Sequence, residues 1–302
     1  MEPDKENLMV MLAHALPSIE AYVDFFLQQP LPVLRRTIGE FNQLQRDIDS
    51  VTHQGIATAV LGDPLMAIRL LAHIETHRKR AQNHDIVTVN GALVMMGIIP
   101  FFRAFGKLPT VEDVLAPYPR ALLGLLKVIG RACKAAHYAR DWAIARRDLD
   151  VNEIVIAALL SEAAEIISWI HAPTLTLRVY DMQRIDRQLR SVAAQREIFG
   201  VTARELQLAL IRAWRLPDLL VQLLDESQAG HPRVRMITLA SDFARHVALG
   251  WDNAALPDDI ACLSALLRIP PEALLRHIDA PETLWPKLLP AAYAGAFPAT
   301  LQ

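Results

Sequence analysis

Apolar residues recur at intervals of three and four along most of the chain, as they do on the buried face of an α-helix. Leu65, Ile68 and Leu71 keep this spacing in one segment. Asp63-Pro64 stands before them and supplies a cap and a first-turn proline. We find no convincing run of alternating apolar and polar residues, and the β-branched residues 86–89 fit the approach to a helix better than a strand. The pattern predicts an all-α fold.

Capping-box spacings and prolines in the sequence predict where further helices begin. Asp150 and Glu153 are spaced as a capping box before an apolar run over residues 154–167, in which Leu159, Leu160, Ile166 and Ile167 are expected to be buried. Thr202 and Glu205 repeat the capping-box spacing. Short helices are expected to restart after four prolines, which are Pro217, Pro232, Pro257 and Pro271.

The longest helix is predicted over residues 119–147. Its inward positions are expected at Leu122, Leu126, Ile129, Cys133 and Ala136. Residues 106–119 contain three prolines and read as a connection between two packed helical lobes. The predicted organisation is therefore an N-terminal extension over 1–24, a first helical lobe over 25–118, a second over 119–285, and a Pro- and Ala-rich tail over 286–302.

Composition supports a globular chain with no electrostatic preference for a partner. Apolar residues make up 52% of the 302 residues, and 31 basic against 33 acidic residues give a net charge of −2. This balance gives no global reason to expect nucleic acid or an anionic membrane as a partner. Two short basic clusters, Arg78-Lys79-Arg80 and Arg233-Val234-Arg235, are interpreted as solvated helix ends.

The sequence also favours a cytoplasmic location. Its acidic and polar start does not resemble a signal peptide. The most apolar stretch, residues 86–102, is interrupted by Asn90 and Pro100 and falls short of the ~20 residues of a spanning helix. Cys133 and Cys262 are far apart and lack metal-site spacing, as expected in a reducing compartment. We expect a soluble cytoplasmic protein that does not contact a membrane.

Four segments follow one another over residues 25–280 in an order that carries a resemblance. They are QPLPVL at 29–34, LGDPLMAIRLL at 61–71, ALVMMG at 92–97, and a stretch that starts with FGVT at 199 and ends with AWRLP at 217. Together they resemble the HDOD family, a bacterial signalling family related to HD-type metal-dependent phosphohydrolases. The resemblance implies that residues 119–285 form an HD-type helical lobe.

The resemblance also indicates where an HD-type metal site would lie. A Gly-Leu-Leu-His-Asp-Ile-Gly motif of related proteins falls on residues 158–164, so Ser161-Glu162 stands in place of the His-Asp pair. A later Gly-x-x-His position falls on Ala203, and a double-His segment falls near Asp225-Glu226. The first metal-binding histidine would fall at residues 131–133, where there is none.

Such sites need imidazoles and carboxylates that converge on a metal. The resemblance therefore implies a degenerate site, with no catalytic residue, no metal ligand and no cofactor. His137 lies about one helical turn from residue 133 and would reach the pocket in a shifted register. The candidates for this vestigial pocket are Ser161, Glu162, Ala203, Asp225, Glu226 and His137.

Other candidate chemistry is weak. His73 and His77 would share a helix face, which suits a metal, but Glu75 points elsewhere on that helix and we interpret the two as a surface pair. No Gly-x-Ser-x-Gly nucleophile motif and no Gly-rich phosphate loop is present.

These features favour a non-enzymatic signalling or regulatory module that binds a protein partner or a small ligand. Arginine is favoured at interfaces, so Arg184, Arg187 and Arg190 are a candidate partner surface. One alternative is an HD-type phosphohydrolase with a site rearranged around His137, Glu162, Asp225 and Glu226. A second alternative is a nucleic-acid-binding regulator that uses residues 78–80 or the arginine face that also contains Arg196.

Overall fold

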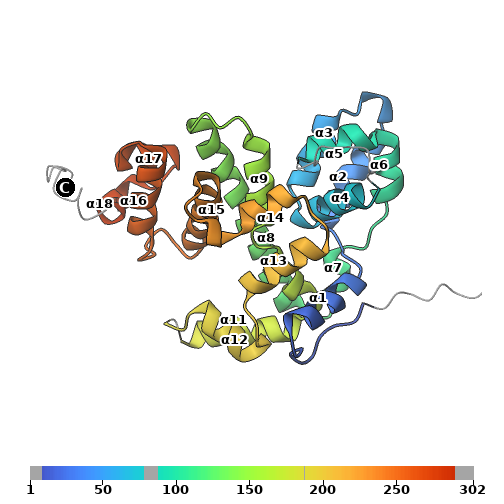
Figure 1. The fold of residues 1–302 in the computed structure, drawn as a ribbon, viewed down its shortest axis with the longest axis horizontal. Helices are drawn as coiled ribbons and strands as arrows, with labels where there is room; N and C mark the ends of the chain where they lie inside the picture. Colours follow the sequence, from blue (N-terminus) through green and yellow to red (C-terminus); the bar gives the residue numbers. More distant parts are fainter. Residues whose placement is uncertain (1–8, 78–87, 187, 290–302) are drawn as a thin grey trace, which may run out of the picture. The chain divides into compact units, whose positions relative to one another are not determined.

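The structure is a computed structural model that describes residues 9–77, 88–186 and 188–289. Within these ranges every regular element is a helix, as Figure 1 shows. The one strand-like pairing among them is an isolated bridge between Val33 and Thr110. The predicted all-α fold is confirmed.

The chain folds into two compact units that are not continuous in sequence. The first unit contains the described residues up to Cys133 together with Glu162–Val221, and the second contains Lys134–Ser161 and the described residues from Gln222 onward. These units do not coincide with the predicted segments 25–118 and 119–285, because residues 119–133 and 162–221 belong to the first unit. Most of the predicted tail lies outside the described residues.

The helices of the first unit precede and follow the long helix α8, Pro119–Ala145, which continues into the second unit. They are α1 (Ile19–Gln28), α2 (Arg35–Gln45), η1 (Ile48–Ser50), α3 (His53–Leu61), α4 (Pro64–His77), α5 (Val89–Met96), α6 (Ile98–Phe105), α7 (Val111–Val114), α10 (Ala163–His171), α11 (Pro173–Ile185), α12 (Ser191–Phe199) and α13 (Ala203–Ala213).

The second unit contains the end of α8 and most of the C-terminal helices. The helix α14 (Asp218–Leu224) leads into it from the first unit. The other helices are α9 (Val151–Leu160), η2 (Glu226–Gln228), α15 (Pro232–Ala248), α16 (Leu256–Leu267), α17 (Pro271–His277), η3 (Glu282–Leu284) and α18 (Trp285–Leu288).

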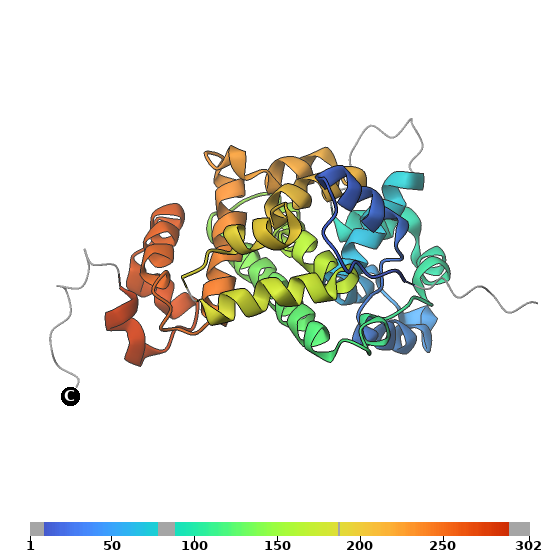
Figure 2. The same cartoon turned by 90° about the horizontal axis from the view of Figure 1, so that it is seen from below.

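The long helix α8 forms as predicted and is drawn in green in Figure 2. Ile129 and Ala136 are buried, as expected. The inward position predicted at Leu126 is wrong: Leu126 is exposed and its neighbour Leu125 is buried. The sequence places leucines on both sides of Gly124, and packing in the first unit selects the face that contains Leu125 and Val128.

The apolar run predicted over residues 154–167 divides into α9 and α10. The break falls at Ser161-Glu162, and the four expected core residues on its two sides are buried. By length and composition, Val151–His171 is the one described segment that could cross a membrane, but 83% of its most apolar window is buried inside the protein. Such burial is typical of a core helix in a soluble protein.

The two predicted capping boxes have different outcomes. At the start of α13, the Thr202 and Glu205 side chains bond to each other's backbone, which confirms the box. The box predicted at Asp150 and Glu153 is wrong, because the Asp150 side chain caps no backbone N–H. Both carboxylates pair with Arg233 instead, at 2.6 and 3.2 Å. Helices do start at or beside the four prolines, as predicted, but only α14 and α17 are short, with 7 residues each, whereas α15 has 17 and α16 has 12.

The cap predicted at Asp63 forms and joins two helices. Its Oδ1 atom accepts hydrogen bonds from the backbone N–H groups of Leu65 at 3.0 Å and Met66 at 3.3 Å. Its Oδ2 atom accepts from the Leu34 N–H and the Thr37 hydroxyl, both at 2.8 Å. Burial raises the pKa of Asp63, and these donors oppose the rise. One buried carboxylate thus ties the N-termini of α2 and α4 together.

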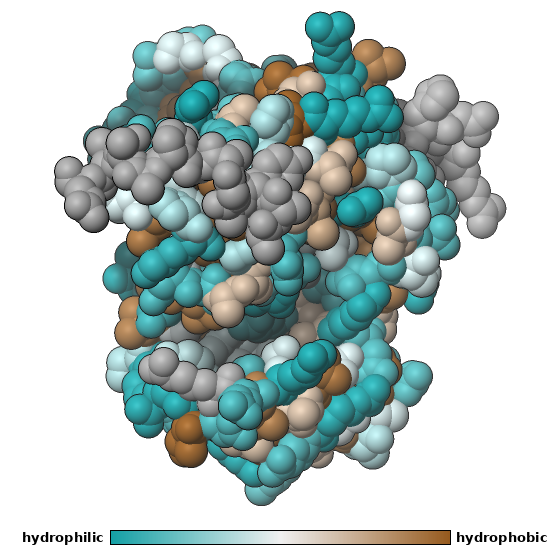
Figure 3. Space-filling model, turned by 90° about the vertical axis from the view of Figure 1, so that its left-hand side faces the viewer, coloured by the Kyte–Doolittle hydropathy of each residue, from teal (hydrophilic) through white to brown (hydrophobic). Residues whose placement is uncertain are grey.

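Each unit has its own core. In the first, α1 packs through Tyr22 and Phe26, and the Tyr22 hydroxyl donates to the Phe199 carbonyl at 2.9 Å. In the second, Trp142 stacks on Tyr138 with ring centres 5.5 Å apart, and Phe243 packs edge-on against both rings. The face shown in Figure 3 has its hydrophobic side chains scattered among hydrophilic ones rather than gathered in one area.

Gly124 allows α8 to approach Trp169 of α10. A Cβ atom at this position would lie 2.5 Å from Cη2 of the indole, and Trp169 is buried. We expect Gly124→Ala to lower the free energy of unfolding by about 1–3 kcal/mol through overpacking. Gly130→Ala is the matched control on the same helix, where a Cβ would meet nothing within 4 Å. Gly130→Ala should raise the free energy of unfolding by about 0.5–1 kcal/mol, because Ala has a higher helix propensity than Gly. Equal changes for the two variants in urea melts would contradict the close contact at Gly124.

His171 makes the first unit sensitive to acid. Its side chain is buried, its Nδ1 atom has no partner, and burial lowers its pKa to about 4. The unfolded chain protonates this imidazole below pH ~6.5, whereas the folded chain does so only near pH 4. Stability should therefore fall by on the order of 3 kcal/mol as the pH drops through this window. His171→Leu should remove that part of the pH dependence in urea melts, and His14→Gln, at an exposed site, should retain it.

Candidate functional site

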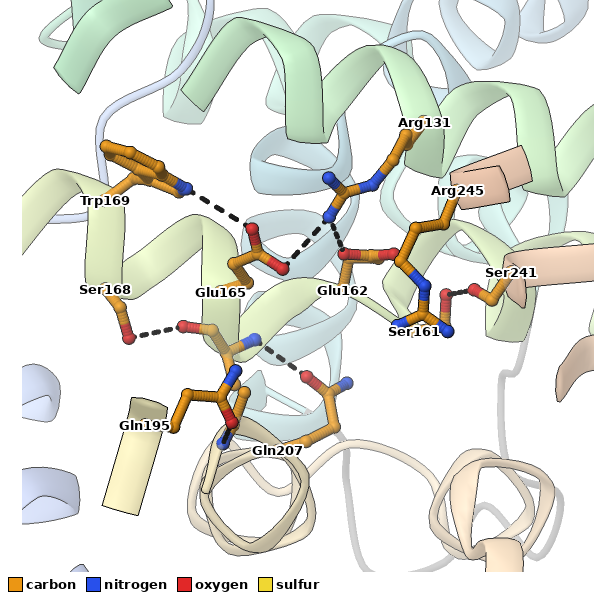
Figure 4. Close-up of polar contacts among 12 residues, drawn as sticks. Arg131, Ser161, Glu162, Glu165, Ser168, Trp169, Gln195, Gln207, Ser241 and Arg245 are labelled. Carbon is orange, nitrogen blue, oxygen red and sulfur yellow. Dashed lines mark hydrogen bonds and ion pairs between the residues drawn. The ribbon is translucent and has the colours of Figure 1, made fainter. Parts of the chain in front are cut away.

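The break between α9 and α10 brings two glutamates to one arginine of α8. Nη2 of Arg131 lies 2.5 Å from Oε2 of Glu162 and 3.0 Å from Oε2 of Glu165. Figure 4 draws both contacts as dashed lines. Glu162 precedes α10 and Glu165 lies in its first turn, so the two carboxylates share one side of the helix start. We call these three residues the Arg131 cluster.

Burial makes the Arg131 cluster more than a surface ion pair. The side chains of Arg131 and Glu162 are 18% and 9% exposed, and that of Glu165 is 32% exposed. Burial alone would lower the pKa of Arg131, but the charges of Glu165 and Glu162 outweigh it and raise this pKa above its usual value. The guanidinium therefore keeps its positive charge at every pH at which the protein is folded.

A glutamine of another helix caps the start of α10 in place of Glu162. The N-cap residue of α10 is Glu162, yet its side chain accepts no capping bond from this helix. Oε1 of Gln207 in α13 accepts from the Ala164 N–H at 2.7 Å instead (Figure 4). Gln207 is buried, so α13 satisfies the start of α10 while the Glu162 carboxylate points at Arg131.

The indole of Trp169 completes this side of the site. Its Nε1 atom donates to Oε1 of Glu165 at 3.4 Å, one turn along α10. Glu165 thus accepts from Trp169 through one oxygen and from Arg131 through the other. The close packing at Gly124 fixes the position of Trp169. Because Trp169 donates to Glu165, the geometry of the cluster depends on the distance between α8 and α10.

The side chains of the Arg131 cluster do not fit a divalent metal. A guanidinium stands within hydrogen-bond distance of both carboxylates, and its charge opposes that of a metal ion. Among the described residues, no group of three or more His, Cys, Asp or Glu side chains is placed to hold a metal.

The remaining candidates of the vestigial pocket have contacts within their own units. Ser161 belongs to the second unit, where its hydroxyl donates to the Ala158 carbonyl and bonds to that of Ser241 at 2.5 Å. Ala203 begins α13 in the first unit, and its backbone N–H donates to Gln195 at 2.9 Å. The methyl side chain of Ala203 offers no ligand to a metal.

His137, Asp225 and Glu226 all belong to the second unit. His137 is exposed on α8 and pairs with Asp141 of the same helix at 3.3 Å. Asp225 caps the short helix η2, where its Oδ1 atom accepts from the Ser227 N–H at 3.0 Å, and Glu226 is the first residue of that helix.

The candidate partner surface is only partly described. Arg184 is exposed and lies 3.7 Å from Asp181, and Arg190 is exposed just before α12. Arg187 and the basic residues 78–80 lie outside the described residues. Arg196 of the same arginine face pairs with Glu205 at 2.6 Å.

His73 and His77 stack with ring centres 4.1 Å apart, and the His77 ring contacts the His73 carbonyl.

Comparison with known proteins identifies the fold family. The family model of the HDOD domain matches residues 31–229. The chain belongs to the HDOD family. The match covers the whole Arg131 cluster and Gln207, so the features described above lie within the HDOD domain itself.

Two solved structures show the same fold. The MmoQ response regulator of Methylococcus capsulatus str. Bath is 21% identical, with a TM-score of 0.60, over 83% of this chain and 98% of that one. A virulence factor from Campylobacter jejuni subsp. jejuni is 18% identical, with a TM-score of 0.63, over 92% of this chain and 99% of that one. No curated protein matches the chain.

Three residues of this HDOD site were missed as site residues from the sequence. Glu165 could have been found, because it follows Glu162 by three residues, and side chains at this spacing are neighbours on a helix. Arg131 lies in the segment 131–133, where the resemblance would place the first metal-binding histidine, but its pairing was not predicted. Gln207 follows Ala203 by four residues on the same helix, and no local pattern marks it as a cap for α10.

The Gln207 cap should be measurable. Gln207→Ala removes the acceptor from a buried N–H group, so we expect a loss of about 1–3 kcal/mol in the free energy of unfolding. Gln195→Ala is the control: its side chain also accepts from a helix N-terminus, but it is partly exposed and water can replace it. A loss at Gln195 as large as that at Gln207 would contradict the role given to Gln207.

Proposed function

We propose that this HDOD protein is a cytoplasmic, non-enzymatic signalling module that acts by binding a protein partner. The observation that carries the proposal is the Arg131 cluster, because a paired guanidinium stands where the resemblance places metal ligands. Family membership supports a signalling role, and one structural relative is named a response regulator. Ser161 and Ala203 contribute no metal-binding side chain at the matching positions.

A protein partner is favoured over a small ligand in the vestigial pocket. The charges at the start of α10 are paired with Arg131 and so are satisfied within the chain. A cavity of about 440 Å³ in the first unit lies elsewhere, where the ends of α2 and α3 are joined by η1. Its lining combines polar residues such as Glu40 and Asp47 with apolar ones such as Leu44 and Val51, and none of them belongs to the Arg131 cluster.

Metal content and turnover test the absence of enzyme activity. Protein purified without chelator should contain well below one equivalent of iron, manganese or zinc, and should not hydrolyse cyclic dinucleotides or nucleotide phosphates. The reason is that carboxylates without imidazoles hold transition metals weakly. Stoichiometric metal found by elemental analysis, with turnover that Glu162→Ala abolishes, would establish the rearranged phosphohydrolase instead.

The exposed arginines test the partner surface. We expect the double variant Arg184→Glu/Arg190→Glu to lose partners that the native protein captures, because charge reversal disrupts a complementary surface. Arg46→Glu/Arg103→Glu is the control, with the same change in net charge at two other exposed arginines of the first unit. The measurement is a pull-down with quantitative mass spectrometry, and capture that survives in the first variant would remove this surface from the proposal.

A further inference from the structure

The residues before α1 form an irregular segment that is bound to the first unit where α10 ends and α11 begins. Residues 9–18 contain no helix and no strand, and they are drawn in dark blue before α1 in Figure 1. We call this segment the strap. It lies outside residues 31–229, which the HDOD family model matches, yet it bonds to residues of the HDOD domain.

Both backbone groups of Leu12 in the strap are hydrogen-bonded at this junction. Its N–H donates to the His171 carbonyl at 2.7 Å, and its carbonyl accepts from the Thr174 hydroxyl at 3.4 Å. The last carbonyls of a helix have no partner within that helix, so the strap satisfies one that α10 leaves open. Bonds to the main chain of a bound segment do not depend on its side chain at that position. A different segment can therefore make the same two bonds.

The side chains of the strap are apolar and are held less firmly than those of the helix that follows. Met9, Met11, Leu12 and Leu16 are only partly buried, and they pack against the hydrophobic core of the first unit. In α1, by contrast, Tyr22 is completely buried. The strap contains no Asp, Glu, Lys or Arg. It has the chemistry of an uncharged, mainly apolar peptide that lies on the surface of the core.

The residue that receives the Leu12 N–H has a polar atom that the strap leaves unsatisfied. The side chain of His171 is 1% exposed, and among the described residues its Nδ1 atom has no hydrogen-bond partner. A buried polar atom without a partner has a cost in free energy. A segment that offers a hydroxyl or amide group to this atom would remove the cost. The strap is therefore not the best ligand for the place that it occupies.

We propose that the junction of α10 and α11 is a peptide-binding site, which the strap occupies within its own chain and which takes an uncharged, apolar segment of a protein partner when the strap is displaced. The strap is then an autoinhibitory segment, which competes at high effective concentration because it is tethered beside its site. The inference rests on the proposed function in requiring a protein partner. Its site lies at the start of α11, whereas Arg184 lies near the end of that helix.

The probe for this site is a synthetic peptide with the sequence of residues 9–18, and fluorescence anisotropy measures its binding. The full-length variant Leu12→Pro lacks the N–H that donates to His171, so its own strap should compete less well. We expect the peptide to bind this variant on the order of tenfold more tightly than it binds the native chain.

Two modified peptides test the backbone contact. N-methylation at the position of Leu12 removes one hydrogen bond and should weaken binding to the Leu12→Pro variant about three- to tenfold. N-methylation at the position of Ala13, which is exposed in the strap, is the matched control and should leave the affinity unchanged.

Hydrogen exchange of the native chain is a second test, which holds even if Leu12→Pro does not fold. The Leu12 amide should have a protection factor on the order of tenfold or more below that of the Tyr22 amide, because the strap opens without α1. An excess of the strap peptide should lower the protection of Leu12 further, since it displaces the strap.

Three outcomes would overturn the proposal. They are equal protection of the two amides, peptide binding that is no tighter in Leu12→Pro than in the native chain, and native dimers that Leu12→Pro dissociates, which would assign the site to a second copy of this chain. Each of them leaves partner capture through Arg184 and Arg190 unaffected, so a failure here is distinguishable from a failure of the proposed function.

Discussion

The contact between Arg131 and the start of α10 constrains much of the first unit. It requires the helix that runs from residue 151 to break at Ser161-Glu162, so that both carboxylates face α8. It also requires another residue to cap α10, and Gln207 of α13 does so. Close packing of Gly124 against Trp169 then sets the distance between α8 and α10. Charge, capping and packing therefore depend on the same junction.

Most helices could be predicted because their signals are local. A proline in the first turn and a Thr–Glu capping box act over three or four residues, and α4 and α13 form where these signals stand. Asp150 failed as part of a capping box because Arg233, 83 residues away, takes its carboxylate. Leu126 failed as a core residue because the leucines beside Gly124 define two faces, and only tertiary packing selects one.

The sequence located the segments of the site but did not predict the contacts between them. The resemblance led to Glu162 and to the segment that contains Arg131, but the pair is separated by 31 residues and forms only when α8 packs on α10. Gln207 contacts Ala164 across 43 residues. Hydrogen bonds over such separations follow from the arrangement of helices and leave no periodic pattern in the sequence. The resemblance therefore pointed to the segments that meet at this site, whereas the structure shows which contacts they make.

The interleaved course of the chain has a consequence for its synthesis. The first unit is interrupted after Cys133 and resumes at Glu162, and it ends only at Val221. When Arg131 is added to the growing chain, its acidic partners are still 31 and 34 residues away and the Gln207 cap is further still. Helices α2 to α6 have mostly local contacts and can assemble early, whereas the junction of α8 with α10 must wait for more than seventy further residues to be added. Folding of this unit is therefore completed late, and the chain offers no point between residues 134 and 221 at which translation could pause with the first unit finished.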